Sequence, residues 1–95
     1  MRIDLGDATL TRANLVGADL TEAHLPRADL NDADLSNANL RLADLRGANL
    51  EDTNLVGANL SEADLEGATG VTGEELEEQT TSLEAATVPD GAEHD

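Results

Sequence analysis

Cysteine and all three aromatic residue types are missing from this sequence of 95 residues. Without cysteine the chain has no disulfide, no thiolate metal ligand and no cysteine nucleophile, so nothing argues for an oxidising compartment or a redox role. Without Phe, Tyr or Trp it lacks the large side chains that fill ordinary cores and the rings on which nucleic-acid bases stack. Any core must therefore be aliphatic and built from many small contributions.

Basic residues are also scarce. The sequence has no lysine and only five arginines against 21 Asp and Glu, which gives a formal net charge of -16 and an isoelectric point of about 4.1. Binding to nucleic acid or to an anionic membrane needs clustered cations, so direct binding to either is not expected. The length allows one small domain, which is too small to support an elaborate enzyme cleft.

Long hydrophobic runs are absent as well. The first twenty residues alternate charged residues with leucine, so they predict neither a signal peptide nor a membrane span. We therefore expect a cytoplasmic protein.

What the sequence has in abundance is a repeat of five residues. Two positions before each repeated leucine stands alanine, with Ile3 and Thr53 as substitutes, and the residue just before the leucine is almost always Asp or Asn. A fixed short period is typical of solenoid proteins, so these leucines are the predicted structural core. They are Leu5, Leu10, Leu15, Leu20, Leu25, Leu30, Leu35, Leu40, Leu45, Leu50, Leu55, Leu60 and Leu65.

A period of five fits neither a helix nor a straight strand. At about 100° per residue, leucines five apart would be scattered around a helix, and their odd spacing would send them to alternate faces of a strand. Within one repeat, however, Ala and Leu lie two apart and share one side of a short extended segment. If the chain then turns a corner, every repeat points the same pair inward, which predicts a solenoid. Residues suited to corners are Gly6, Gly17, Gly47, Gly57, Gly67, Asn31, Asn37, Asp32 and Asp52.

Units such as residues 18–22 (ADLTE) and 58–62 (ANLSE) resemble the A(D/N)LXX motif of the pentapeptide-repeat proteins. The resemblance runs from Ile3 to Gly67 almost without a break. It implies an all-β fold, a right-handed quadrilateral parallel β-helix of about three to four coils, with Leu and Ala inside and the other positions facing solvent. Four repeats would make one coil, so residues twenty apart would stack about 4.8 Å from each other.

Stacking at twenty residues predicts which outward side chains become neighbours. In this register Arg41 alone among the arginines lacks an acidic neighbour, and His24 lies between Asp4 and Asp44. Exposed ion pairs contribute about 0 to 1 kcal/mol each, so the pairing tests the register more than it explains stability. The predicted pairs are Arg2 with Glu22, Arg12 with Asp32, Arg27 with Asp7, and Arg46 with Glu66.

After the repeats, helix-start signals appear. Thr72 and Glu75 predict a capping box, and Val71 and Leu76 the matching hydrophobic staple. The predicted helix covers about residues 73–80.

The chain therefore divides into three predicted parts. Residues 1–70 form the β-helix, residues 71–90 a C-terminal cap, and residues 91–95 a disordered acidic tail. Within the cap, residues 81–90 look like two degenerate repeats in a shifted phase, so we expect the chain to rejoin the coil after the helix. Helix and repeats together would close that end of the stack and shield its unpaired backbone.

The amino-terminal end has no comparable cap. An open coil end exposes unpaired strand backbone and apolar side chains, which favours coverage by another surface. We expect a homodimer through this uncapped N-terminal coil.

The many carboxylates do not predict a metal or cofactor site. They recur in the slot before leucine, where an Asp or Asn side chain bonds its own turn and keeps the surface soluble. His24 occupies that slot once; it is read as a surface histidine beside acids, with a ligand or recognition role as the alternative. No Ser, Cys or second His completes a catalytic set around it, so we do not expect an enzyme.

Four apolar residues stand at positions that should face outward, namely Val16, Val56, Leu42 and Pro26. Single exposed apolar residues are normal, but Val16 and Val56 share a predicted side and would mark a partner patch. The candidate partner contacts are Val16, Val56, Leu42 and His24.

The leading functional interpretation is a non-enzymatic scaffold, a structural or protein-interaction module with an unknown protein partner, because almost every residue serves the repeat. The alternative comes from the resemblance: some pentapeptide-repeat proteins mimic B-form DNA in shape and charge and bind DNA gyrase, inhibiting or protecting it. The repeats alone would span roughly 16 Å, less than one turn of DNA, so a gyrase-binding mimic would have to act as a dimer.

Overall fold

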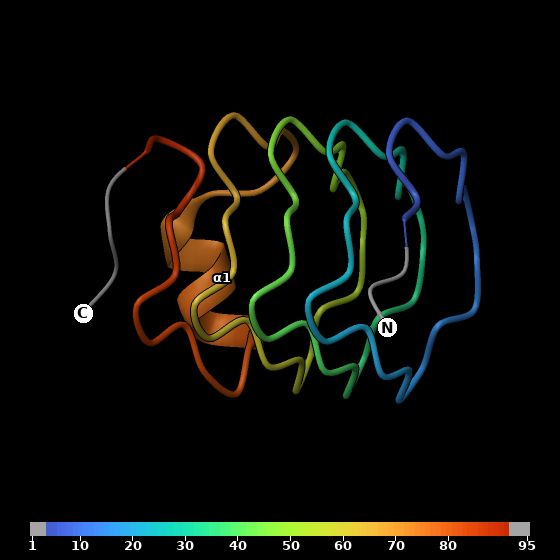
Figure 1. Ribbon diagram of the computed structural model, residues 1–95. Coiled ribbons are helices and arrows are strands. Elements are labelled where there is room, and N and C mark those ends of the chain that lie inside the picture. Colours follow the sequence, from blue (N-terminus) through green and yellow to red (C-terminus); the bar gives the residue numbers. More distant parts are fainter. Residues whose placement is uncertain (1–3, 92–95) are drawn as a thin grey trace.

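The structure, a computed structural model, describes residues 4–91. The chain winds into a stack of similar coils, and each coil takes twenty residues (Figure 1). Parallel β-bridges join residues twenty apart, from Asp4 and His24 at one end to Asn49 and Thr69 near the other. These bridges are isolated and form no extended strand in residues 4–91, because a corner interrupts the chain every five residues. The predicted stacking register is therefore confirmed.

Each corner is a tight turn closed by one backbone hydrogen bond. The amide of each alanine donates to the carbonyl of the leucine three residues earlier, as from Ala8 to Leu5 at 3.0 Å. The second corner residue has a positive φ, for example 68° at Gly17 and 63° at Leu42, which is the pattern of a type II turn. Four such corners complete one coil. Gly6 and Asn31, two of the predicted corner residues, occupy the first corner position and do not have positive φ.

The Asp or Asn before each leucine binds its own turn. Its side-chain oxygen accepts a hydrogen bond from the backbone N–H two residues later, at 3.0 Å from Val56 to Asn54 and 3.0 Å from Glu66 to Asp64. A carboxylate and an amide oxygen serve equally as acceptors, which explains why the two residue types alternate in this slot. The abundant acids are thus parts of turns, as the sequence predicts.

The interior is a dry column of leucine and alanine. The ten repeated leucines from Leu20 to Leu65 are buried, with exposed fractions of 5% or less. Leu5, Leu10 and Leu15 are only half-buried, because they lie on the first coil and no described residue stacks on their outer side. Thr53 replaces alanine without loss of burial, since its hydroxyl donates to the carbonyl of Leu30 at 2.7 Å.

The helix α1, Gly73–Gln79, begins at the predicted capping box. Thr72 accepts a hydrogen bond from the N–H of Glu75, and the Glu75 carboxylate accepts one from the N–H of Thr72. Leu76 is buried, and Val71 is half-buried against the same core. The helix ends one residue earlier than predicted, with Thr80 as its C-cap.

α1 replaces one side of the last coil (Figure 1). Beyond it the bridges join residues twenty-three apart, Asn59 with Ser82 and Asp64 with Thr87, so the helix adds three residues to the coil. Leu83 and Ala86 return to the buried interior. The chain thus rejoins the stack after the helix. Residues 92–95 of the predicted disordered tail lie outside the described residues.

Candidate interaction surface

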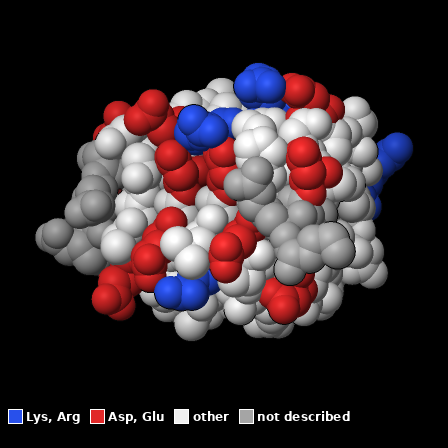
Figure 2. Space-filling view, in the orientation of Figure 1, with Lys and Arg blue, Asp and Glu red and all other residues white. Residues whose placement is uncertain are grey.

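The outward sides of the stack differ in charge. One side, formed by residues 13–17, 33–37 and 53–57, carries Asp34 as its single charged residue; we call it the charge-poor face. Over the same three coils each of the other sides carries at least four charged residues. Acidic side chains are scattered over the surface visible in Figure 2, and arginines among them are few.

Two of the predicted contact residues lie together on the charge-poor face. Val16 and Val56 have exposed fractions of 50% and 57%, the highest of the large apolar side chains in the described chain. Ser36 stands between them in the same stacked column and is half-buried. The column therefore presents two apolar side chains that nothing in residues 4–91 covers.

The one charge on this face is tied to its own turn. The Asp34 carboxylate accepts a hydrogen bond of 3.0 Å from the backbone N–H of Ser36, and the hydroxyl of Ser36 also stabilises it. These hydrogen bonds, the backbone one foremost, lower the pKa of Asp34. The carboxylate stays ionised, but its hydrogen-bonding capacity is partly used.

Leu42 lies on a different side. Its exposed fraction is 39%, and it occupies a corner next to Arg41, whose Nη2 is 3.2 Å from Oε1 of Glu62. Leu42 is therefore not brought together with Val16 and Val56. Pro26 was expected to face outward but is buried, and its ring lies close to Gly6 on the preceding coil.

His24 stands in a column of acids, as the register predicts. Its bridge partners are Asp4 and Asp44, and its Nδ1 lies 3.4 Å from Oδ2 of Asp44 without making a hydrogen bond. Asp44 is instead held by Arg46, whose Nη2 and Nε donate to it at 2.7 and 2.8 Å. Arg46 lowers the pKa of Asp44. His24 is therefore a partly covered neighbour of an ion pair that forms without it.

The outward ion pairs test the predicted pairing one by one. Arg27 binds Asp7 through two hydrogen bonds of 2.8 and 3.1 Å, as predicted, and this contact lowers the pKa of Asp7. The other predicted ion pairs do not form in the described chain, because arginine side chains at the corners are long enough to reach acids beside them or diagonally on the next coil.

Arg46 pairs with Asp44 on its own repeat and approaches Asp64 at 4.0 Å, and no ion pair with Glu66 is formed in the described chain. Arg41, predicted to be alone, binds Glu62 twenty-one residues away. Arg12 makes no ion pair with Asp32 within residues 4–91, and Arg2 lies outside the described residues.

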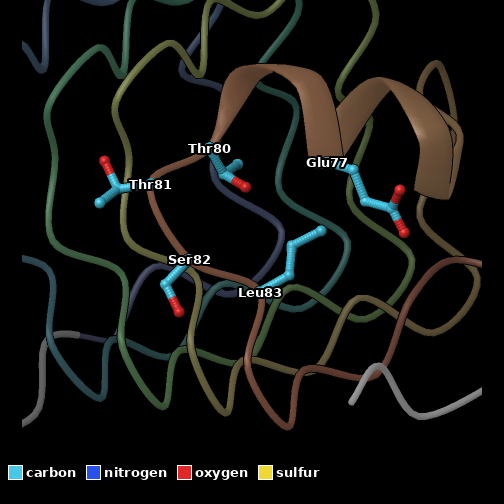
Figure 3. Close-up of a pocket in the computed structure, with 5 residues that line it drawn as sticks. All are labelled: Glu77, Thr80, Thr81, Ser82 and Leu83. Carbon is cyan, nitrogen blue, oxygen red and sulfur yellow. The ribbon is translucent and has the colours of Figure 1, made fainter.

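A small open pocket of about 330 Å³ lies where α1 rejoins the coil (Figure 3). The hydroxyls that line it are already engaged: Thr80 donates to the carbonyl of Leu76 at 2.6 Å and Thr81 to that of Gly57 at 2.7 Å. Ser82 accepts from the N–H of Glu84 at 3.2 Å and points to the opposite side from Leu83. The pocket thus offers few free groups to a ligand, and sequence reasoning did not identify it.

No three His, Asp or Glu side chains converge in a metal-binding arrangement within residues 4–91. In the same part of the chain, no helix has the length and apolar character needed to cross a membrane.

A scan against protein families matches pentapeptide repeats, in eight copies, over residues 3–41 and 33–69. Among solved structures the chain is similar to a pentapeptide repeat protein from the thylakoid lumen of Arabidopsis thaliana, at 36% identity and a TM-score of 0.59, over 90% of this chain and 57% of that one. It is also similar to HetL, a pentapeptide repeat protein involved in heterocyst differentiation regulation from the cyanobacterium Nostoc sp. strain PCC 7120. That match has 36% identity and a TM-score of 0.46, over 96% of this chain and 43% of HetL.

A further pentapeptide repeat protein from Nostoc PCC 7120 has 37% identity and a TM-score of 0.45, over 90% of this chain and 64% of that one. The chain thus spans between 43% and 64% of the length of these solved neighbours. A comparison with the curated proteins gives no significant match.

Proposed function

Because the chain belongs to the pentapeptide-repeat family, with the right-handed β-helix that its solved neighbours imply, we propose that it is a non-enzymatic scaffold that binds a protein partner. The proposal rests on the different roles of the five positions in each repeat. Leu and Ala fill the interior, and the Asp or Asn between them bonds its own turn. The two corner residues of each repeat are left to vary, and their stacked columns form the kind of extended surface through which solenoids bind partners.

The titratable groups support a binding role over a catalytic one. The carboxylates of Asp7 and Asp44 have lowered pKa values because arginines bind them on the outside of the stack. A catalytic acid or base works best with a pKa near the working pH, in a site that excludes water. These carboxylates have instead the properties of surface ion-pair partners.

Affinity capture from a native lysate tests the scaffold function. The wild-type chain is immobilised beside two variants, Val56→Glu on the charge-poor face and Leu42→Glu at the other exposed apolar corner. We expect at least one protein to be retained by the wild type and lost on one of the two variants. If the three columns retain the same proteins in the same amounts, these surfaces bind no partner and the proposal is wrong.

One observation favours the DNA-mimic alternative as a second candidate. Residues 4–91 contain 19 acidic residues and four arginines, a formal net charge of -15, and the longest dimension of the molecule is 29 Å. This is about one charge per 1.9 Å, close to the spacing of about 1.7 Å in double-stranded DNA. The molecule is still shorter than one turn of DNA, about 34 Å, so a dimer is required.

A DNA-supercoiling assay with purified gyrase tests this second candidate. Inhibition of supercoiling by micromolar protein is the expected result. Unchanged supercoiling, in protein that sedimentation shows to be monomeric, would exclude the mimic. The cytoplasmic location remains a prediction that fractionation of the source cells would test.

A further inference from the structure

We propose that His24 is a pH-dependent clasp between the second and third coils, in which the protonated ring donates a hydrogen bond from Nδ1 to the carboxylate of Asp44. The inference goes beyond the proposed scaffold function and does not depend on it, because it concerns the stack alone. It rests on a buried nitrogen without a partner, on the proline that follows His24 and on the charged residues around the ring.

The nitrogen without a partner is Nδ1 of His24. Among the buried side-chain nitrogen and oxygen atoms of residues 4–91, it alone makes no hydrogen bond. It lies 3.4 Å from Oδ2 of Asp44, whereas a charge-assisted hydrogen bond between nitrogen and oxygen measures about 2.7 to 2.9 Å. Buried polar atoms nearly always have a partner, so an exception calls for a physical reason.

Pro26 supplies that reason. In most repeats the side chain before the leucine accepts a hydrogen bond from the backbone N–H two residues later, as Asp44 does from Arg46 at 3.1 Å. Nδ1 of a histidine is as many bonds from the backbone as Oδ1 of an aspartate, so it could accept the same hydrogen bond. The residue two positions after His24 is Pro26, which has no N–H. His24 is therefore not tied to its own turn, and its Nδ1 is left beside the next coil.

Protonation changes what Nδ1 can do. In a neutral imidazole one ring nitrogen carries a hydrogen and the other is an acceptor, and an acceptor Nδ1 has nothing to bind beside a carboxylate oxygen. The protonated ring has an N–H on both nitrogens. Its Nδ1–H would be directed at Oδ2 of Asp44, so that a small approach of the two side chains completes a charge-assisted hydrogen bond.

Acids outnumber arginines around the ring. Asp4 and Asp44 are the β-bridge partners of His24 on the first and third coils. Both nearby arginines are already bound to carboxylates, Arg27 to Asp7 and Arg46 to Asp44. Within residues 4–91, the charged residues on this side of the first three coils and at the corner before His24 are Asp4, Asp7, Glu22, Arg27, Asp44 and Arg46. A protonated ring would therefore lie in a net negative environment.

Asp44 is ionised in the pH range in which the clasp would form. The side-chain hydrogen bonds from Arg46 foremost, and the charge of His24 to a smaller degree, lower the pKa of Asp44. Imidazole groups gain their proton near pH 6.5, well above the range in which a carboxyl group is protonated. Between these two ranges the clasp would pair a cation on the second coil with an anion on the third.

The clasp would strengthen the end of the stack that is least buried. The carbonyl of His24 accepts a hydrogen bond from the N–H of Leu5 at 2.6 Å, and Leu5 on the first coil is only half-buried. His24 thus already bonds to the first coil through its backbone, and the clasp would add a bond to the third coil through its side chain. Because this bond exists only in the folded chain and needs the proton, the folded state gains stability as the pH falls from about 8 to 5.5.

Urea denaturation of the full chain at pH 8 and pH 5.5 is the first test, with His24→Asn as the variant that cannot titrate. Because the two side chains are 26% and 21% exposed, we expect the unfolding equilibrium constant of wild type, relative to His24→Asn, to fall about threefold between these pH values. His94→Asn is the matched control, since His94 is the only other histidine, and it should respond to pH as wild type does. A ratio between wild type and His24→Asn that is the same at both pH values would overturn the proposal.

Pro26→Ala tests why Nδ1 is free. The substitution returns an N–H to the corner, and the neutral His24 ring can then accept the hydrogen bond that other repeats form. The pH response of Pro26→Ala, measured against the double variant Pro26→Ala/His24→Asn, should therefore be smaller than threefold or reversed. A response equal to that of wild type would overturn the role assigned to Pro26.

Crystal structures at pH 5.5 and pH 8 test the geometry directly. The distance from Nδ1 of His24 to Oδ2 of Asp44 should shorten from 3.4 Å to about 2.8 Å at the lower pH. The same long distance at both pH values would overturn the clasp. These measurements use the purified chain alone, so their outcome is separate from the capture experiment that tests the scaffold function.

Discussion

At the scale of single residues, the fold depends on one left-handed residue in every repeat. The second corner position has positive φ at Gly17, Gly47, Gly57 and Gly67, and ten other corners have a non-glycine residue there, such as Leu42 with φ of 63°. A residue with a Cβ disfavours this conformation by about 1 to 2 kcal/mol. The stacked interior therefore imposes a conformation that many of these corner residues do not prefer.

Two glycines distinguish the strain of a positive φ from the steric overlap that an added Cβ would cause. Gly17 and Gly70 both have positive φ, but a Cβ at Gly17 meets nothing, and one at Gly70 would overlap the backbone N and Cα of Glu51. We expect Gly17→Ala to lower the free energy of unfolding by about 1 kcal/mol and Gly70→Ala by about 3 kcal/mol or more. Urea denaturation measures both. Equal losses would mean that the backbone at Gly70 moves freely away from Glu51.

Asp44 gives a prediction about pH. Arg46 lowers the pKa of Asp44 in the folded chain, so below the unfolded value of about 3.9 the unfolded state binds more protons. The stabilisation is present above that pH and is lost as the pH falls through the folded value. Thermal unfolding should show wild type more stable than Asp44→Asn by a few tenths to about 1 kcal/mol at pH 7, with the difference shrinking as the pH falls below about 4.

Arg46→Gln removes the cause of that pKa shift. Its profile should therefore approach that of Asp44→Asn. Parallel pH profiles for wild type and both variants would show that this exposed pair contributes nothing to stability.

At the scale of elements, α1 substitutes for a missing segment of coil. The side chain of Gln79 supplies an acceptor that a backbone carbonyl supplies in the other coils: its Oε1 accepts a hydrogen bond from the N–H of Leu55 at 3.2 Å. The backbone carbonyl of Gln79 accepts a second hydrogen bond, from the N–H of Gly57 at 2.8 Å. Residues twenty positions after Leu55 are helical and cannot supply these acceptors in the usual way. The helix is thereby joined to the stack by hydrogen bonds as well as by Leu76.

Gln79→Ala should show how much the side-chain hydrogen bond from Gln79 contributes to joining the helix to the stack. The N–H of Leu55 loses its acceptor in a partly buried site, which costs about 1 to 2 kcal/mol. Hydrogen exchange at the Leu55 amide should accelerate more than exchange at Leu35, which is bonded to the carbonyl of Asn54. Gln79→Glu keeps an acceptor oxygen and should stay close to wild type. Unchanged exchange at Leu55 in Gln79→Ala would show that water replaces the side chain.

Much of the architecture is predictable because the same sequence signals recur in every repeat. The fifth-residue leucines predict the interior, the Asp and Asn before them predict the turn bonds, and Thr72 with Glu75 predicts where α1 begins. Each of these features depends on residues close in sequence or on a strict period.

Features that depend on the length of a side chain or on the packing around it were not predictable from the sequence. Arg41 binds Glu62 because a long side chain at a corner crosses to the next coil diagonally. Pro26 is buried at a corner position that was expected to face solvent, with Gly6 of the preceding coil close to its ring. Within the candidate site, the shared side of Val16 and Val56 followed from the register, but the scarcity of charge around them emerges only when all four sides are compared.

At the scale of the whole molecule, stability is uneven along the stack. Leu40 in the middle is fully buried, whereas Leu10 on the first coil is half-buried. Solenoids gain stability from contacts between neighbouring coils, so the interior coils are held on two sides and the first described coil on one. Local opening should therefore begin at the first coil.

Alanine substitution of these two leucines measures the gradient. Leu40→Ala should cost about 3 to 5 kcal/mol, and Leu10→Ala about half as much because less of its side chain leaves water on folding. Chemical denaturation measures both losses. Equal losses would indicate that another part of the polypeptide covers the first coil.

Because five residues advance the chain by one corner, an insertion or deletion of five residues rotates everything after it by a quarter turn about the stack axis. Removing a single five-residue block between Val16 and Val56 would keep every remaining leucine inside, yet it would carry Val56 a quarter turn away from Val16. Adding a block of twenty would restore the alignment and only lengthen the cylinder. The count of blocks between two corner residues, more than their chemical identity, decides whether they can meet the same partner.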